Sequence, residues 1–216
     1  MKLGSGRSYY GLLWGLAIVG TVLDQATKYG VFKWLYDERW IPNHDGHQNK
    51  YEIVSGWFQL LTQFTGTLDD KTSVLSPLRT ASGALLPKVN QGALFGFLRE
   101  HGEVANALFA LVSIIAVIAI VYWSRRPSTT RDISLCAALG LILAGTLGNL
   151  YDRIVFDGVR DFLYFYWINW PVFNVADCCL VVGASLLLAQ AFWNRQHSPD
   201  HEIRLRVMSS EVAQVK

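Results

Sequence analysis

The chain has 216 residues, of which 51% are hydrophobic and 17% are charged, and its formal net charge is +2. Soluble domains carry about 25% charged residues, so this composition indicates a membrane protein. A net charge this small, with no basic stripe or patch, excludes nucleic acid as the expected partner.

Four apolar stretches predict membrane-spanning helices, because each meets or approaches the ~20 residues that a spanning helix needs. The first starts at Tyr9 and continues through "LLWGLAIVGTVLDQATKYGVF", and the second covers Val104 to Trp123 without any charge. The third follows from Ile133, and the fourth begins near Val175. A cleaved signal peptide is the alternative for the first stretch, but no small-residue cleavage site precedes its polar positions, so we expect an uncleaved helix.

The connections between these stretches predict how the chain crosses the membrane. The segment "SRRPSTTR" between the second and third stretches is long enough only for a turn, so these two helices must be antiparallel. Basic side chains favour the cytoplasmic side, and they occur in this turn and near both ends of the chain: Lys2, Arg7, Arg125, Arg126, Arg131, Arg195, Arg204 and Arg206. We therefore expect both termini in the cytoplasm and the segments at about 31–103 and 152–173 on the outer side. There, Trp57, Trp167 and Trp170 suit an aromatic belt at the membrane interface.

The long outer segment has the composition of short strands and loops. "YEIVSGWFQLLTQFTG" and "KVNQGALFGFL" contain β-branched and aromatic residues bounded by glycines, which predicts short strands. Between them, "TLDDKTSVLSPLRTASGALLP" is polar and rich in turn-forming residues, so we expect a flexible insertion there.

The cysteines and histidines give little support for a metal site or a disulfide framework. Cys136, Cys178 and Cys179 lie in apolar runs without CxxC spacing, and we expect them to pack as small apolar residues. The pairs in "HDGH" and "HSPDH" are possible metal ligands, but short polar loops contain such pairs by chance. The chain also lacks HExxH, GxSxG and a phosphate-binding glycine loop. We therefore expect neither a metal nor another cofactor.

Asp24 and Lys28 form the first polar pair inside an apolar stretch. They are four residues apart, so they share one helix face and can form an ion pair in the outer half of the membrane. A structural pair that offsets its own burial is the favoured interpretation, and direct participation in chemistry is the alternative.

Further polar residues gather in "GNLYDRIVFDGVRDF", where the third helix is expected to end. Asn149 and Arg153 share a helix face at i, i+4, whereas we expect Asp152 on a different part of the helix surface. An Asn and Arg pair can bind a carboxylate or a peptide carbonyl through charge-assisted hydrogen bonds. Helix capping combined with a cationic anchor at the lipid headgroups explains the same residues equally well.

Asp161 and Asp177 are flanked by apolar residues at the predicted outer membrane boundary. A charged group costs about 2.5–3.5 kcal/mol at the centre of a membrane helix, so an acid in such a place indicates a function. Two carboxylates at one site cannot both ionise cheaply, and they share a proton. Such a dyad can activate water and protonate a carbonyl oxygen, which hydrolyses a peptide without a metal. Translocation of ions or protons is the alternative use of intramembrane acids.

Five motifs, in this order, give the chain a resemblance to the lipoprotein signal peptidases, also called signal peptidase II. The motifs are "DQATK" at 24–28, "NQGALFG" at 90–96, "GNLYDR" at 148–153, "VRDF" at 159–162 and "FNVAD" at 173–177. The resemblance extends from about Tyr9 to Arg195. It implies an all-α polytopic membrane protein with four transmembrane helices and a small extracytoplasmic β-cradle.

The resemblance also implies roles for individual residues. Asp161 and Asp177 match the catalytic pair of the family. The matching polar positions that bind substrate or support this pair are Asn90, Asn149, Arg153 and Asn174. Asp24 and Lys28 match a motif that is structural, and the resemblance implies no metal.

The expected function is that of a membrane aspartyl endopeptidase. It cleaves the signal peptide from diacylglyceryl-modified prolipoproteins just before the lipidated cysteine, and we expect a monomer in contact with membrane lipid. The implied location is the bacterial cytoplasmic (inner) membrane, with the active site near the outer leaflet. A transporter that uses Asp24, Asp161 and Asp177 as a proton relay and a non-catalytic scaffold are the alternatives.

Two segments depart from the family pattern. The insertion at about 65–87 lies within the expected cradle region of 37–103, where the family has a short connection. The membrane peptidase domain is expected to cover 1–195, followed by a mobile cytoplasmic tail at 196–216.

Overall fold

The computed structural model describes residues 8–36, 47–67, 74–81, 85–92 and 102–196. Gln196 is the only residue of the expected cytoplasmic tail within these ranges. Most of the "NQGALFG" motif and both members of the second histidine pair lie outside them.

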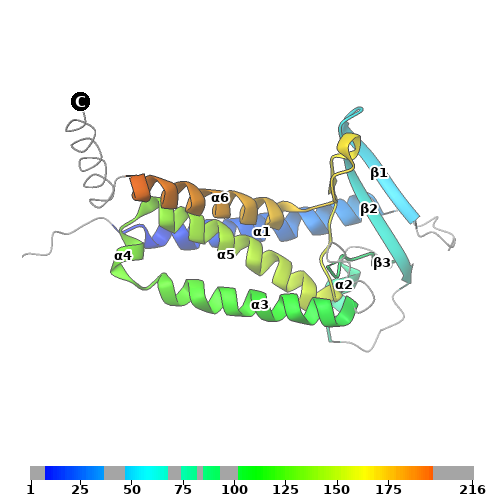
Figure 1. The fold of residues 1–216 in the computed structure, drawn as a ribbon. Coiled ribbons are helices and arrows are strands. Elements are labelled where there is room, and N and C mark those ends of the chain that lie inside the picture. Colours follow the sequence, from blue (N-terminus) through cyan, green and yellow to red (C-terminus); the bar gives the residue numbers. More distant parts are fainter. Residues whose placement is uncertain (1–7, 37–46, 68–73, 82–84, 93–101, 197–216) are drawn as a thin grey trace, which may run out of the picture.

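Four long helices form a bundle, as the apolar stretches predicted (Figure 1). They are α1 (Tyr10–Trp34), α3 (Gly102–Trp123), α5 (Ile133–Phe156) and α6 (Val175–Gln196). Among the described residues, three helices are long and apolar enough to cross a membrane, namely α3, α5 and α6. In α5, 56% of the most apolar 18-residue stretch is buried inside the protein. The corresponding shares are 17% in α3 and 11% in α6, so α5 is the central helix.

The central position of α5 depends on small residues and on an apolar core. Leu13 and Ala17 of α1 pack with Leu139 and Leu143 of α5.

A short helix, α4 (Pro127–Thr130), lies in the turn between α3 and α5, and these two helices are antiparallel as expected (Figure 1). The α5 helix then begins at a good N-cap, because the Asp132 side chain accepts a hydrogen bond from the backbone N–H of Leu135.

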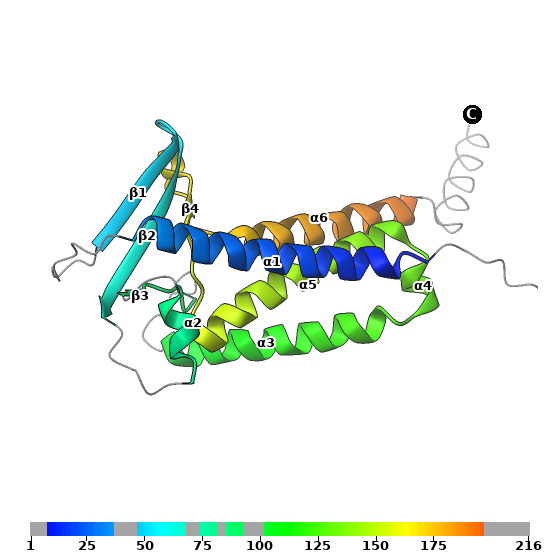
Figure 2. The same cartoon turned by 180° about the vertical axis from the view of Figure 1, so that it is seen from behind.

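A small antiparallel sheet lies at one end of the bundle (Figures 1 and 2). Strands β1 (His47–Val54) and β2 (Phe58–Thr67) confirm the short strands predicted in this segment and form a hairpin, in which Gly56 turns the chain with a φ of 81°. Two very short strands, β3 (Leu85–Pro87) and β4 (Leu163–Tyr164), pair with the opposite edge of β2.

The prediction of a strand in "KVNQGALFGFL" is wrong for the part that the structure describes. The strand in this region is β3, which ends at Pro87, and beyond it only Asn90 forms an isolated bridge, with Val159. The chain leaves the extended conformation two residues later, because Gly92 adopts a φ of 111°. An added Cβ at Gly92 would lie 2.6 Å from the ring of Phe109, so this turn favours glycine.

The expected flexible insertion contains more structure than its composition indicated. It includes helix α2 (Ser76–Thr80) as well as β3. Helix α2 is held against α1 and α5 because Arg79 donates a hydrogen bond to the carbonyl of Val155, and the Tyr29 hydroxyl donates to the carbonyl of Leu78.

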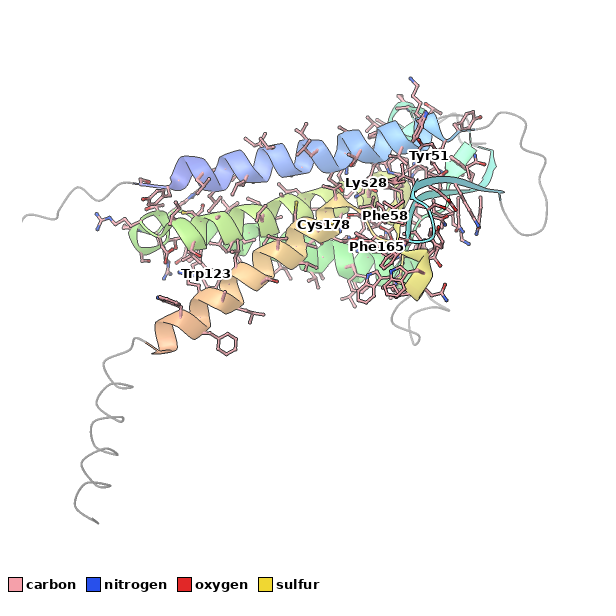
Figure 3. The ribbon with its side chains drawn as sticks, turned by 90° about the horizontal axis from the view of Figure 1, so that it is seen from above. Lys28, Tyr51, Phe58, Trp123, Phe165 and Cys178 are labelled. Atoms are coloured by element: carbon pink, nitrogen blue, oxygen red, sulfur yellow. The ribbon has the colours of Figure 1, made fainter. Side chains whose placement is uncertain are left out.

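The sheet is fixed to the bundle by an aromatic core. Phe32 at the end of α1 packs with Phe64 of β2 and with Phe162, and the Phe32 and Phe64 ring centroids are 5.8 Å apart. Figure 3 shows Phe58 and Phe165 at this end of the molecule and Trp123 at the opposite end. The start of α1, the end of α6 and α4 all lie at that opposite end (Figure 1). The segment that joins α5 to α6, residues 157–174, therefore lies at the sheet end of the bundle, where it contributes β4 to the sheet.

We expect Gly145→Ala to destabilise the bundle, because an added Cβ would lie 2.3 Å from the backbone oxygen of Ala176 on α6. Overpacking of this kind costs about 1–3 kcal/mol. Gly15→Ala on α1 is the matched control, since its Cβ would meet nothing within 4 Å, and this variant should be neutral or slightly stabilised. Reversible unfolding in mixed micelles measures both changes, and equal stabilities would contradict the close contact of α5 and α6.

Candidate active site

Polar side chains converge where α5 ends, α6 begins and the 157–174 segment joins them at the sheet end of the bundle. Of the residues predicted from the sequence, Asp161, Asp177, Asn90, Asn149 and Asn174 are joined here by hydrogen bonds. Asp24 and Lys28 of α1 support this site, because Lys28 donates a hydrogen bond to Asn149. Five separate segments of the sequence therefore contribute to it.

The first turn of α6 holds the Asp177 side chain in place. Asn174 precedes the helix, and its side-chain oxygen accepts a hydrogen bond of 3.0 Å from the backbone N–H of Asp177. In return, the Asp177 carboxylate accepts a hydrogen bond of 3.1 Å from the backbone N–H of Asn174. This reciprocal pair has the arrangement of a capping box, with Asn and Asp in the places of Ser and Glu. Asp24 satisfies another N–H of the same turn, because its carboxylate lies 2.9 Å from the nitrogen of Ala176.

The Asp161 carboxylate is bound by two amide groups. Asn174 Nδ2 donates to Asp161 Oδ1 at 2.7 Å, and Asn90 Nδ2 donates to Asp161 Oδ2 at 3.0 Å. The Asn90 amide is itself oriented, because its oxygen accepts a hydrogen bond from the backbone N–H of Gly92. Asn174 thus contacts both carboxylates, through its side-chain amide at Asp161 and its backbone N–H at Asp177.

Burial raises the pKa of Asp161 to about 7, and the negative charge of Asp177 contributes to the same shift. The amide groups of Asn90 and Asn174 act in the opposite direction, since they donate hydrogen bonds to the carboxylate. Near neutral pH, the site can therefore hold a proton on Asp161.

A cavity of about 590 Å³ opens beside the two carboxylates. Its ionic and amide groups belong to Asn90, Asn149, Arg153, Asp161 and Asp177. The remaining walls are mainly apolar and include Phe109, Trp170, Val181 and Val182. Arg153 lies over the ring of Phe109, with 5.4 Å between the guanidinium carbon and the ring centroid. The cavity can therefore accept an apolar ligand that presents one polar group to the carboxylates.

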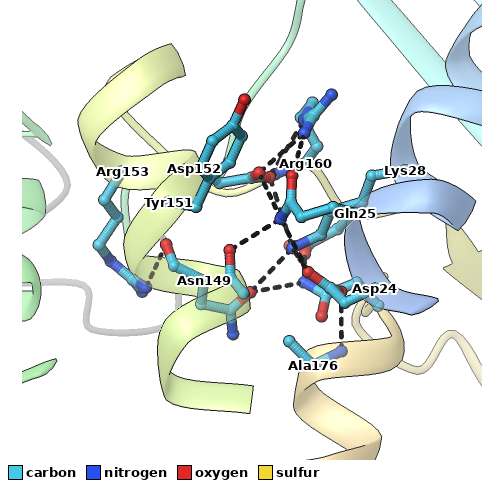
Figure 4. A network of polar contacts seen from close by, with 12 residues as sticks. Asp24, Gln25, Lys28, Asn149, Tyr151, Asp152, Arg153, Arg160 and Ala176 are labelled. Carbon is cyan, nitrogen blue, oxygen red and sulfur yellow. Dashed lines mark hydrogen bonds and ion pairs between the residues drawn. The ribbon is translucent and has the colours of Figure 1, made fainter. Parts of the chain in front are cut away.

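A buried ionic cluster supports this site from the side of α1 (Figure 4). Lys28 Nζ lies 2.8 Å from Asp24 Oδ2 and 3.4 Å from Asp152 Oδ2, so the predicted pair of Asp24 and Lys28 is confirmed. Arg160 donates to both oxygens of Asp152, through Nε at 3.1 Å and Nη2 at 2.9 Å, and its backbone N–H donates to Asp152 Oδ2. All four charged side chains are fully buried, and their formal charges cancel.

The ionic cluster also orients an amide that contacts Asp177. Lys28 Nζ donates to Asn149 Oδ1 at 3.1 Å. Only the oxygen of an amide can accept this bond, so the Asn149 nitrogen faces the other way, where it donates to Asp177 Oδ1 at 2.8 Å. The position of the Asp177 side chain therefore depends on the charged Lys28 ammonium, although the two groups are not in contact.

One sequence expectation about this region needs correction. Asp152 was expected on a different part of the helix surface from Asn149, yet both side chains contact Lys28. Residues at i and i+3 are also neighbours on a helix, and the long Lys28 side chain spans the space between them.

The sequence interpretation missed the parts played by Arg160 and Gln25. Gln25 Nε2 donates to both Asp24 and Asp152, and its oxygen accepts from Arg160. The Arg160 guanidinium also lies over two rings, 3.9 Å from the centroid of Phe156 and 4.2 Å from that of Tyr29. Both residues lie within motifs quoted above, Gln25 in "DQATK" and Arg160 in "VRDF", and this was the signal that could have found them.

Among the described residues, no group of three or more His, Cys, Asp and Glu side chains is arranged to hold a metal ion. The three cysteines are free thiols, with Cys136 buried and Cys178 exposed on α6. The exposure of Cys178 differs from the packing role expected for it.

We expect Asp152→Asn to lower the stability of the protein by about 3–5 kcal/mol, because it leaves the buried Lys28 and Arg160 without one of their opposing charges. Asp132→Asn is the matched control, since Asn is an equally good N-cap and Asp132 caps α5 at the other end. Unfolding monitored by tryptophan fluorescence compares the two variants. If both lose the same small amount, the ionic cluster is not what holds this region together.

Comparisons with known proteins identify the family. Residues 16–193 match the signal peptidase (SPase) II family. The chain is 35% identical over 198 residues to the lipoprotein signal peptidase of Rhodopirellula baltica, which covers 85% of this chain and 72% of that protein. It is 36% identical over 194 residues to that of Nitratidesulfovibrio vulgaris, which covers 88% and 94%. A solved bacterial membrane enzyme shares the fold, with a TM-score of 0.64, 21% identity and coverage of 89% and 95%. The chain therefore belongs to the signal peptidase II family of aspartic peptidases.

Proposed function

We propose that this protein cleaves the signal peptide from diacylglyceryl-modified prolipoproteins, just before the lipidated cysteine, with Asp161 and Asp177 as the catalytic pair. The observation that carries the proposal is the position of Asn174, which binds both carboxylates at the wall of a largely apolar cavity. The relatives in Rhodopirellula baltica and Nitratidesulfovibrio vulgaris are lipoprotein signal peptidases, which supports this substrate class.

In the proposed mechanism, the two aspartates begin in different protonation states. The Asp177 carboxylate takes a proton from a water molecule as the water oxygen bonds to the scissile carbonyl carbon. Asp161 gives its proton to the carbonyl oxygen, and a neutral tetrahedral diol results. When the carbon–nitrogen bond breaks, the proton now on Asp177 passes to the leaving amine, and a diol hydroxyl returns its proton to Asp161.

The arrangement of the site supports this assignment of roles. Asp177 lies in the first turn of α6, where the positive end of the helix dipole interacts favourably with a carboxylate. Burial raises the pKa of Asp161 to about 7, so this residue can carry the proton under ordinary conditions. Asn90, Asn149 and Asn174 hold the two side chains, and Arg153 is placed on the cavity wall to bind a substrate carbonyl.

We also propose that α1 is a fourth membrane span, alongside the three helices whose composition alone indicates spanning. It has 25 residues, which corresponds to about 37 Å of helix. Its two buried charges, Asp24 and Lys28, face the bundle and oppose each other. Under this proposal both termini, including the tail at 196–216, lie in the cytoplasm of a bacterial cell, and the sheet lies outside the inner membrane.

Exposed tryptophans support placing the sheet at the membrane surface. Trp57 and Trp167 are each 56% exposed and contact each other, with ring centroids 4.7 Å apart. Tryptophan is enriched at membrane interfaces because its ring is amphipathic. A proton relay is a weaker interpretation of the acids, because the Asp24 carboxylate is already occupied by Lys28 and the N–H of Ala176.

We expect Asp161→Asn and Asp177→Asn each to abolish cleavage of a diacylated prolipoprotein, since either change removes a proton-transfer group. A loss of at least about 10²-fold is expected from removal of general acid or base catalysis. The purified protein is assayed by gel shift, with chelator present throughout. Asp157→Asn, at the end of α5 and outside the cavity lining, is the control and should retain activity. Near-parental turnover by either dyad variant would mean that the residue is not the acid or the base.

We expect kcat/KM to decline as the pH rises above about 7, because Asp161 loses the proton that it must donate. The decline approaches tenfold per pH unit once the acid is mostly ionised. A rate that stays constant to pH 9 would contradict the role of Asp161 as the acid.

The same pKa shift predicts how stability depends on pH. Folding raises the pKa of Asp161 above its usual value of 3.8, so the protonated folded state is favoured at low pH and this contribution is lost as the pH rises toward about 7. The Asp161→Asn variant should lack this part of the pH dependence when Tm is measured between pH 4 and pH 8. An unchanged profile would contradict the raised pKa.

A further inference from the structure

A second cavity, of about 310 Å³, adjoins the first on the side of the sheet. The two cavities share five lining residues: Asn90, Val159, Asp161, Pro171 and Val172. The proposed catalytic acid therefore stands at the junction of two spaces. A substrate cleaved at this junction has one part in each cavity.

The two cavities differ in their surroundings. The larger one is walled by Phe109 of α3 and by Val181 and Val182 of α6, all within helices that are apolar enough to span a membrane. The smaller one also has apolar walls, such as Leu61 and Val89, but it adds the polar side chains of Gln63 on β2 and of Lys88 in the segment that follows β3. Apolar substrate groups thus match the larger cavity, and a polar chain matches the smaller one.

Lys88 gives the smaller cavity its charge. Among the described residues of this lining, Lys88 and Asp161 are the ionisable ones. The backbone N–H of Lys88 donates to the carbonyl of Gln63 at 2.8 Å, which fixes the segment against the edge of β2. The Lys88 side chain is exposed, and within the described part of the chain it forms no ion pair.

We propose that the smaller cavity binds the residues that directly follow the lipidated cysteine, and that Lys88 makes this subsite favour acidic side chains. This inference rests on the proposed function. The signal peptide and the acyl chains are apolar and remain with the larger cavity, whereas the mature chain is polar and leaves toward the sheet. An extended chain advances about 3.3 Å per residue, so the first residues after the cysteine are the ones that reach the cavity beside Asp161.

The size of the preference follows from the exposure of Lys88. An ion pair that remains accessible to water contributes little, and this corresponds to about a threefold to fivefold change in relative kcat/KM. The preference should weaken as salt is added, because exposed charges are screened.

Three diacylglyceryl prolipoprotein peptides test the proposal in one competition reaction followed by mass spectrometry. They are identical except that the two residues after the cysteine are both Asp, both Ser or both Lys. The parent protein should cleave them in that order of preference. Lys88→Ala should make the three rates nearly equal, and Lys88→Glu should reverse the order.

The matched control is Lys33→Glu, which makes the same charge change at an exposed position near the sheet end of α1. This variant should keep the parental order. An unchanged order in Lys88→Glu, or an equal loss of rate on all three peptides, would overturn the subsite. Failure of the parent protein to cleave any of the three would instead overturn the proposed function, so the two failures are distinguishable.

Discussion

The carboxylate of Asp152 lies between Lys28 and Arg160, and this contact joins three parts of the chain that carry the site. Lys28 belongs to α1, Asp152 to α5, and Arg160 to the segment that leads directly to Asp161. Moving charges out of water costs several kcal/mol per ion, so the cluster is stable only when each charge is opposed and hydrogen-bonded. The cluster therefore fixes the backbone beside Asp161 and the amide that contacts Asp177, although none of its members lines the larger cavity.

At the start of α6, the same side chains cap the helix and form part of the proposed catalytic site. A helix that begins inside a low-dielectric region must satisfy the N–H groups of its first turn. Asn174, Asp177 and Asp24 do so here, and Asp177 is also a member of the proposed dyad. An acid at this position is thus less costly than the same acid in the middle of the apolar run, because it interacts with a helix N-terminus and its carboxylate accepts hydrogen bonds from Asn149 and Asn174.

The sequence predicted the long elements well and the short ones poorly, for physical reasons. The four helices are long apolar runs, and the hairpin of β1 and β2 has a strand pattern interrupted at Gly56. Strands β3 and β4 have three and two residues, which is too short to show any alternation, and the pairing of Asn90 with Val159 joins positions far apart in the chain. The two aspartates were found by motif, but spacing alone left their distance open. Arg160 was missed because a loop has no periodicity from which its direction can be inferred.

The junction of the two cavities at Asp161 limits the paths by which substrate and water can reach the proposed catalytic pair. The larger cavity continues along apolar residues of α3 and α6, whose side chains suit acyl chains. In the proposed reaction, the hydrolytic water arrives from the sheet side, through the smaller cavity that contains Gln63 and Lys88. In the proposed reaction, the polar product leaves by the same side and the cut signal peptide stays with the lipid. Asp161, whose pKa is raised by burial, lies at this junction, so the proposed proton donor is placed between the apolar and polar parts of the proposed substrate.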